Sequence, residues 1–147
     1  MDYRIIETDD FLALSTLFHN SGMGVPISER KPERIIKMWR MENAETGELL
    51  AAVTLEKRDG VFSLGDIAVN SSYRQHHYGN IMQNVVFDEA RKMNVSEIWA
   101  CARLPEYYLH CGWEAMDWDA SPNIAVYCTS CGKRGTECHP EIMRYTL

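Results

Sequence analysis

Residues 66–80, DIAVNSSYRQHHYGN, are the most informative part of this sequence for predicting its fold. Its beginning, Asp66 to Val69, ends a β-prone run, and Gly79 stands at the start of a long helical pattern. The first amides of a helix have no intrahelical acceptor, and the helix dipole favours negative charge there. A strand that turns into a helix at this point would therefore form a pyrophosphate site. One glycine at a helix start is also ordinary turn chemistry, so both interpretations stay open.

Periodicity and turn residues predict the elements around this stretch. A helix is expected from Gly79 to about Lys92, because apolar residues recur there at the helical period. Before the turn, the runs Leu49–Leu55 and Val61–Val69 predict a hairpin. The other expected elements are a strand at Tyr3–Glu7, a helix over Phe11–Phe18 capped by Asp9 or Asp10, a short helix after Pro32 with Ile35, Ile36 and Trp39 on one face, a strand at Ser96–Ala102, a short helix around Pro105–His110, a strand from Trp113, and extended segments at Ile124–Cys128 and Ile142–Tyr145.

Composition indicates a soluble globular protein. The length of 147 residues suits one domain, and 46% of the residues are hydrophobic. The formal net charge of -6 argues against nucleic-acid binding, which usually needs a basic face, and mildly favours a cationic partner. The N-terminus carries Glu7, Asp9 and Asp10 and has no unbroken apolar run. We therefore expect neither a signal peptide nor a membrane span, and predict a cytoplasmic protein.

A second informative stretch, YYLHCGW at residues 107–113, follows one predicted helix and one predicted strand later. Taken alone, its tyrosines would be aromatic residues of the core and its rim. Together with the turn and the order of elements, however, it resembles the coenzyme-A-binding core of the GNAT acetyltransferases. The family pattern Phe-Tyr-x-x-x-Gly-Phe finds a chemically similar residue at each fixed position of this stretch.

The turn resembles the family pattern Arg/Gln-x-x-Gly-x-Gly/Ala in part. Arg74 falls on its first position and Gly79 on its last, whereas His77 replaces the first glycine. The family often has an asparagine seven positions before the second tyrosine of the other stretch, and Cys101 stands there. The resemblance spans about Leu49 to Trp113.

This resemblance implies an α/β (α+β) fold, a single acetyltransferase domain over residues 1–147. Its central mixed, mostly antiparallel sheet would be splayed in the middle and flanked by helices on both faces. Acetyl-CoA would lie between the two splayed strands. His76 and His77 are either protonated donors to the phosphates or solvated loop residues. The implied cofactor-binding residues are Ile67, Ala68, Val69, Arg74, Gln75, His76, His77, Tyr78, Gly79 and Asn80.

The resemblance also implies a chemistry, the direct transfer of an acetyl group from acetyl-CoA to a primary amine. Tyr108 would protonate the leaving thiolate, and the amide of Val69 would stabilise the developing oxyanion. Asp66 is the first candidate for accepting the proton of the amine, and Glu56 and Glu106 are weaker candidates. The alternative for Asp66 is a surface or ion-paired aspartate, because its burial cannot be read from the sequence.

The acceptor is expected to approach over the first two helices and the loop near Met23–Ser28. Acidic residues there, such as Glu29 and Glu33, would attract a cation. The sequence does not distinguish a peptide, a polyamine, an antibiotic or a small metabolite, and it leaves open a homodimer. The alternative is a non-catalytic acyl-CoA-binding or thiol- or zinc-sensing module on the same fold, which His77, Cys101 and the cysteine-rich C-terminal segment motivate.

A cysteine-rich C-terminal segment, residues 128–139, offers ligands for zinc. Cys128 and Cys131 have the C-x2-C spacing of thiolate pairs that chelate zinc, and Cys138 and His139 follow. Adjacent residues seldom bind one ion together, so the fourth ligand is open. The alternative fourth ligands are Cys101, Cys111 and His110. The other interpretations of this segment are reduced thiols without a metal, redox-sensing thiols, and a small zinc-stabilised interaction domain.

Overall fold

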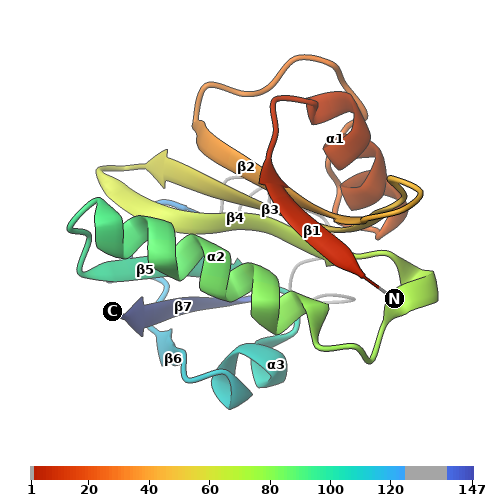
Figure 1. Cartoon of the computed structure of the whole chain (residues 1–147). Helices are drawn as coiled ribbons and strands as arrows, with labels where there is room; N and C mark the ends of the chain where they lie inside the picture. The colour runs from red at the N-terminus through yellow and green to blue at the C-terminus, as the bar shows by residue number, and fades with distance from the viewer. Residues whose placement is uncertain (1, 125–138) are drawn as a thin grey trace.

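In the computed structural model, which describes residues 2–124 and 139–147, seven strands form one sheet (Figure 1). The strand order is β1-β2-β3-β4-β5-β7-β6, and neighbours are antiparallel except for β4 and β5. The predicted mixed, mostly antiparallel sheet is therefore confirmed. The elements are β1 (Tyr3–Glu7), α1 (Phe11–Asn20), β2 (Ile35–Asn43), β3 (Leu49–Arg58), β4 (Val61–Val69), the 3-10 turn η1 (Ser71–Tyr73), α2 (Tyr78–Lys92), β5 (Glu97–Ala102), α3 (Pro105–His110), β6 (Glu114–Met116) and β7 (Glu141–Thr146).

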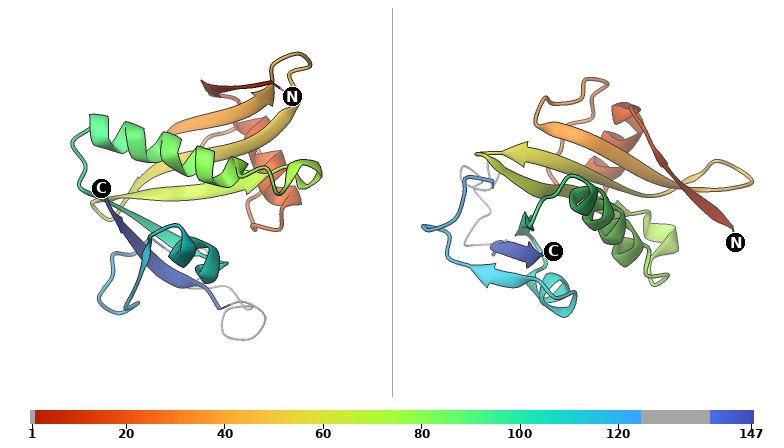
Figure 2. Two further views of the ribbon diagram at one scale, coloured as in Figure 1. Left: turned by 60° about the horizontal axis from the view of Figure 1, so that its bottom comes forward. Right: turned by 60° about the vertical axis from the view of Figure 1, so that its left-hand side comes forward.

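The sheet is splayed between its two parallel strands. β4 pairs with β3 from Val61 to Val69, with one register shift between Leu64 and Ile67, but its register with β5 holds one pair, Ser63 with Trp99. Beyond Ser63 the two strands diverge, and the left view of Figure 2 shows the two parts of the sheet meeting at one end and separating toward the other. Because the ladder between β4 and β5 stops there, backbone groups of β4 are left facing an opening.

Helices cover both faces of the sheet, as predicted. On one face α1 buries Leu14 and Phe18 against Met38 of β2. On the other face α2 buries Met82 and Val86 in a larger core, which Tyr108 of α3 also joins. Each fully buried side chain of this size contributes roughly 1.5–3 kcal/mol of transfer free energy. These two cores hold β4 firmly from both sides and so position the opening beside it.

One predicted element is wrong: the short helix after Pro32 is the strand β2. Its apolar residues face both cores, because Met38 packs on the α1 side while Trp39 and Met41 pack on the α2 side. A strand covered on both faces loses the alternation of apolar and polar residues, and its pattern then imitates a helix. Pairing with β1 and β3 decides the outcome, since both backbone edges of β2 are satisfied in the sheet.

The other predicted elements agree with the structure to within a few residues. Asp10 is the cap of α1, and its carboxylate accepts a hydrogen bond from the amide of Ala13 at 3.1 Å. The hairpin of β3 and β4 is confirmed, as are the helix α3 and the strand β7. The expected extended segment at Ile124–Cys128 lies, beyond Ile124, outside the described residues. Among the helices that the structure describes, none is long and apolar enough to cross a membrane.

Candidate active site

A cavity of about 530 Å³ lies in the opening between β4 and β5. Ten of the residues that the sequence singled out for cofactor binding were expected to meet there, and nine do. His76 is the exception: it does not line the cavity, and its ring stacks on Tyr78 with centroids 5.3 Å apart. The nine that line it are Ile67, Ala68, Val69, Arg74, Gln75, His77, Tyr78, Gly79 and Asn80.

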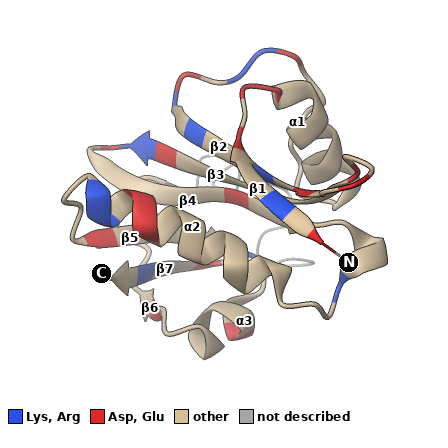
Figure 3. Cartoon of the chain, viewed as in Figure 1, with Lys and Arg blue, Asp and Glu red and all other residues tan. Residues whose placement is uncertain are grey.

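Two residues of the turn into α2 have a left-handed backbone conformation, although neither is glycine. Gln75 and His77 have φ of 75° and 60°, left-handed values that glycine adopts most easily. His77 is the N-cap of α2 and makes no side-chain cap hydrogen bond. The charged residues of α2 lie toward its C-terminal end, and its first turn holds no acidic residue (Figure 3). The amides at the start of α2 therefore face an end of the cavity where an anion is favoured.

Side chains anchor the turn to the neighbouring hairpin. The amide of Asn70 donates to the carbonyl oxygen of Leu50 at 2.8 Å, and its side chain donates to the carbonyl oxygen of Leu49 at 3.0 Å. The hydroxyl of Tyr73, which lines the cavity, donates to Glu48 in the turn between β2 and β3. The start of the short 3-10 segment is thus held to β3, and its end is held to the turn before β3.

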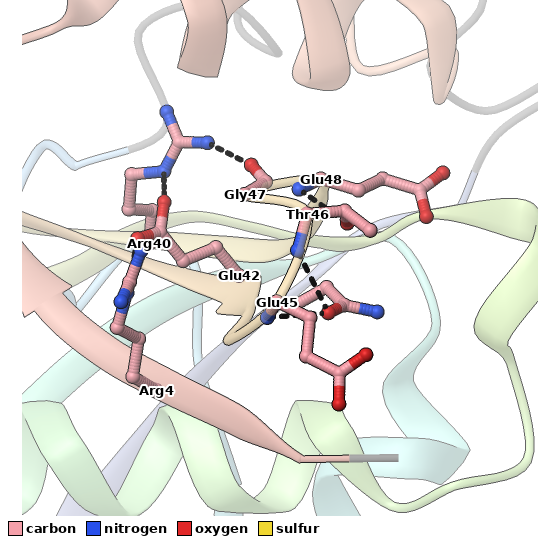
Figure 4. Close-up of polar contacts among 8 residues, drawn as sticks. Arg4, Arg40, Glu42, Glu45, Thr46, Gly47 and Glu48 are labelled. Carbon is pink, nitrogen blue, oxygen red and sulfur yellow. Dashed lines mark hydrogen bonds and ion pairs between the residues drawn. The ribbon is translucent and has the colours of Figure 1, made fainter.

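The turn between β2 and β3 is itself held in place by charged contacts (Figure 4). Arg40 donates to the carbonyl oxygen of Gly47 at 3.2 Å and pairs with Glu42 at 3.1 Å. Arg4 of β1 contacts the other oxygen of Glu42 at 2.5 Å. Because Glu42 is buried, its charge is compensated by these two guanidinium groups. This arrangement fixes Glu48, and through it the loop beside the cavity.

The backbone of β4 presents an amide to the cavity at Val69. The amide of Asn70 points toward β3, where it binds Leu50. Successive amides of a strand point to opposite edges, so the amide of Val69 points toward the side of β5. The strands have diverged there, and Val69 lines the cavity. Its N–H is therefore directed into the opening, where it can donate to a bound carbonyl oxygen.

Asp66 lies in the cavity wall and titrates far from its ordinary range. Burial is the main cause that raises its pKa to about 7, and the nearby charge of Glu56 raises the pKa further. The guanidinium groups of Arg34, Arg58 and Arg103 act in the opposite direction and lower the pKa of Asp66. A carboxyl group with this pKa exchanges protons near neutral pH, as a general base must.

Glu56 is a buried neighbour of this carboxylate. Its side chain pairs with Arg34, whose Nε donates to its Oε1 at 2.6 Å. A Cβ added at Gly65 would lie 1.5 Å from Oε2 of Glu56 and 2.5 Å from the hydroxyl oxygen of Thr54. That hydroxyl accepts from the amide of Asp66 at 2.9 Å. Gly65 is therefore required so that the Glu56 carboxylate can lie over β4 beside Asp66.

Tyr108 is buried at the cavity wall. Its ring packs edge-on against Trp113, with centroids 5.2 Å apart, and against Tyr107 at 5.7 Å. Burial is the main cause that raises the pKa of Tyr108 far above its ordinary value, and the charge of Asp66 contributes to the same shift. The hydroxyl therefore stays protonated at physiological pH and can serve as a proton donor.

Tyr107 closes the same wall over the start of α2. Its hydroxyl donates to Oδ1 of Asn80 at 2.7 Å. A Cβ at Gly79 would lie 2.7 Å from this hydroxyl, so glycine is the residue that allows the close approach. α3 packs against the start of α2 at residue 79. The glycine of the turn motif is therefore needed for this packing, because any larger side chain would collide with Tyr107.

The structure also separates the weaker candidates from the stronger ones. Glu56 lines the cavity, whereas Glu106 does not. Glu29 and Glu33, expected to attract a cationic acceptor, are exposed and are not among the lining residues. Sequence reasoning predicted Arg74 but missed three other arginines of the cavity wall, which come from separate parts of the chain. They are Arg34, Arg58 and Arg103.

The zinc hypothesis falls largely on residues that the structure does not describe. Cys128, Cys131 and Cys138 lie outside the described residues, whereas His139 is described and exposed. Within residues 2–124 and 139–147, no group of three His, Cys, Asp or Glu side chains is arranged to hold a metal ion. Cys111, an alternative ligand in that hypothesis, instead lies 3.5 Å from Oδ1 of Asn80.

The splayed sheet and the cleft between β4 and β5 agree with the class that the comparison with known families identifies, that of the acyltransferases. The model of the acetyltransferase (GNAT) family matches residues 11–113. Because this match covers more than half of the chain, the chain belongs to the GNAT family. Among curated proteins, no sequence matches the chain significantly.

Solved structures share the fold at low sequence identity. N-acetylglutamate synthase from Neisseria gonorrhoeae, complexed with coenzyme A and N-acetyl-glutamate, aligns with 100% of this chain at 18% identity and a TM-score of 0.76. This chain spans 35% of the length of that protein. A GNAT acetyltransferase from Staphylococcus aureus gives 14% identity and a TM-score of 0.72, with 99% of both chains covered. The ribosomal-protein-S18-alanine N-acetyltransferase from Escherichia coli gives 16% identity and a TM-score of 0.68, covering 99% of this chain and 94% of its own.

Proposed function

We propose that this protein transfers an acetyl group from acetyl-CoA directly to a primary amine. The observation that carries the proposal is the meeting of Asp66, Tyr108, Val69 and the turn into α2 in one cavity. The family supports acyl transfer, and the coenzyme A in the N-acetylglutamate synthase structure supports the choice of donor. When bound, acetyl-CoA supplies the activated thioester.

The residues of the turn and of β4 bind and orient the donor. The amides at the start of α2 receive the pyrophosphate, and Arg74 lies beside them in the cavity wall. Val69 donates its N–H to the acetyl carbonyl oxygen, on which negative charge develops during attack. The nonpolar wall of β4 restricts water around the thioester and so strengthens this hydrogen bond.

Asp66 and Tyr108 move the protons of the reaction. Asp66 accepts a proton from the amine, directly or through water, so that the neutral nitrogen forms a bond to the acetyl carbon. Tyr108 gives its proton to the sulfur as the carbon–sulfur bond breaks. The nitrogen loses a second proton to water as the tetrahedral intermediate collapses, and the products are an amide and the free thiol of coenzyme A. Afterwards Asp66 loses its proton to solvent and Tyr108 regains one, which restores both groups.

Acetyl-CoA binding and turnover test this proposal separately. We expect acetyl-CoA to raise the melting temperature, because a ligand that binds only the folded state stabilises it. Release of the coenzyme A thiol, followed with a panel of amines, then reports turnover. Tyr108→Phe should retain the thermal shift and lose most turnover, whereas Tyr3→Phe, an exposed position on β1, should behave as the parent protein. No thermal shift at millimolar acetyl-CoA would refute the proposal.

A further inference from the structure

The part of the cavity wall around Asp66, which we call the basic end, is rich in arginine, although the whole chain carries a net charge of -6. Three arginines line this end, Arg34 from the segment before β2, Arg58 from the end of β3 and Arg103 from the segment after β5. Two carboxylates, Glu56 and Asp66, accompany them. Arginine therefore outnumbers acid around Asp66, the proposed proton acceptor.

Two of the three arginines at the basic end, Arg58 and Arg103, are candidates for binding a negatively charged ligand. Arg34 is committed to Glu56, at 2.6 Å. Among the described residues, neither Arg58 nor Arg103 forms an ion pair with a carboxylate. Asp66 is the remaining acid, and its role as proton acceptor places it against the amine rather than against a guanidinium group.

Backbone contacts hold Arg103 across the mouth of the cavity. Its Nη1 donates to the carbonyl oxygen of Gly22, and its Nη2 donates to that of Ser21 at 3.4 Å. These contacts join the loop after α1 to the segment after β5, on opposite sides of the opening. A carbonyl oxygen leaves the positive charge uncompensated, so the guanidinium group is oriented without being neutralised.

We propose that the acceptor is a small amino acid, whose carboxylate binds Arg58 and Arg103 while its amino group lies against Asp66. This inference rests on the proposed function and adds the class of acceptor to it. The planar guanidinium group matches a carboxylate through paired hydrogen bonds, which favours arginine over lysine for this task. The cavity must also hold the reactive arm of acetyl-CoA, so the space for the acceptor suits a small molecule.

A cationic acceptor fits this end poorly. A polyamine or a lysine side chain would bring a second positive charge toward two arginines that have no carboxylate partner among the described residues. Like charges at close range in a partly desolvated site are destabilising. The acidic residues that the sequence offered as an attraction for cations lie outside the cavity wall.

Matched acceptors test the proposal. The parent protein is assayed for release of the coenzyme A thiol with alanine, glutamate, alaninamide, phosphoethanolamine and putrescine. Alaninamide differs from alanine in its missing carboxylate, and its amine loses a proton more easily, which biases the comparison against the proposal. We expect kcat/KM to be at least about tenfold higher for the amino acids than for alaninamide or putrescine, as loss of a charge-assisted hydrogen bond predicts.

Two substitutions test whether Arg58 and Arg103 bind the carboxylate of the acceptor. Arg58→Gln and Arg103→Gln should each raise KM for the preferred amino acid by roughly tenfold and leave KM for alaninamide unchanged. Binding of acetyl-CoA, followed by thermal shift, should be the same in both variants, which shows that they fold. Arg91→Gln is the matched control, because Arg91 is exposed on α2 and does not line the cavity.

The outcomes separate this inference from the function on which it rests. Acetyl-CoA binding with preferred acetylation of putrescine or alaninamide would keep the proposed function and overturn the amino-acid acceptor. Preferred acetylation of phosphoethanolamine would overturn the carboxylate in favour of a phosphate. Unchanged KM values in both arginine variants would overturn their role. Absence of any acetyl-CoA binding would overturn the proposed function itself, and this inference with it.

Discussion

Replacing Asp66 with asparagine should make the protein more stable at neutral to alkaline pH and less active. The folded protein raises the pKa of this carboxyl group from 3.8 to about 7, so folding favours its protonated form. At a pH below the pKa of the unfolded state, Asp66 is protonated in both the folded and the unfolded state, so its ionisation does not lower the free energy of unfolding. As pH rises from there to the folded pKa, the parent protein loses stability, because its folded state binds more protons than its unfolded state. At a pH above the pKa of the folded state, this loss of unfolding free energy, which is the penalty of burying the ionised carboxylate, is constant.

The magnitude follows from the shift in pKa. A change of roughly three units corresponds to about 4 kcal/mol, since each unit is worth about 1.4 kcal/mol. Asp66 is half-buried at a cavity wall rather than enclosed, so solvent reduces this to about 2 kcal/mol. The asparagine variant lacks the penalty at every pH. The difference in unfolding free energy between variant and parent should therefore grow by about 2 kcal/mol between about pH 4 and about pH 8.

Urea unfolding of both proteins across this pH range measures that difference, and release of the coenzyme A thiol measures activity. In the parent protein the catalytic form is the ionised one, so activity at about one unit below the pKa should be roughly a tenth of its plateau. The asparagine variant should lose about 10²-fold or more of the activity. A stability difference that does not change with pH, or a variant that becomes relatively less stable as pH rises, would refute the reasoning.

Three further substitutions test individual parts of the site. Tyr108→Phe should lower kcat by about 10²-fold with acetyl-CoA affinity unchanged, measured by steady-state kinetics and thermal shift. His77→Gly should raise the unfolding free energy by about 1 kcal/mol, because φ of 60° is strained for histidine; equal or lower stability would contradict this. Gly65→Ala should lower stability by about 1–3 kcal/mol, since its Cβ would lie 1.5 Å from Glu56, and unchanged urea unfolding would count against the packing described.

Much of the fold can be predicted from interactions between residues that are close in the sequence. The turn over residues 66–80 and the hairpin before it depend on residues that are close in sequence, so periodicity and turn signals suffice to place them. The apolar pattern of β2 imitates that of a helix because its apolar residues pack in two cores at once, and this packing depends on the neighbours of β2 in the sheet. The positions of Asp66, Tyr108 and Val69 at one cavity were expected from the family resemblance, and their roles remain predictions.

Residue type and local spacing are enough to identify which residues could bind phosphate and move protons, because they limit that chemistry. The electrostatics of the cleft depend instead on the packing of distant segments. The raised pKa of Asp66 needs burial and the adjacent charge of Glu56, which comes from another strand and has room because residue 65 is glycine. Arg58 and Arg103 likewise line one cavity, although they come from distant segments. Charge and burial act through space, so no reading along the chain could have found the basic end of the cavity.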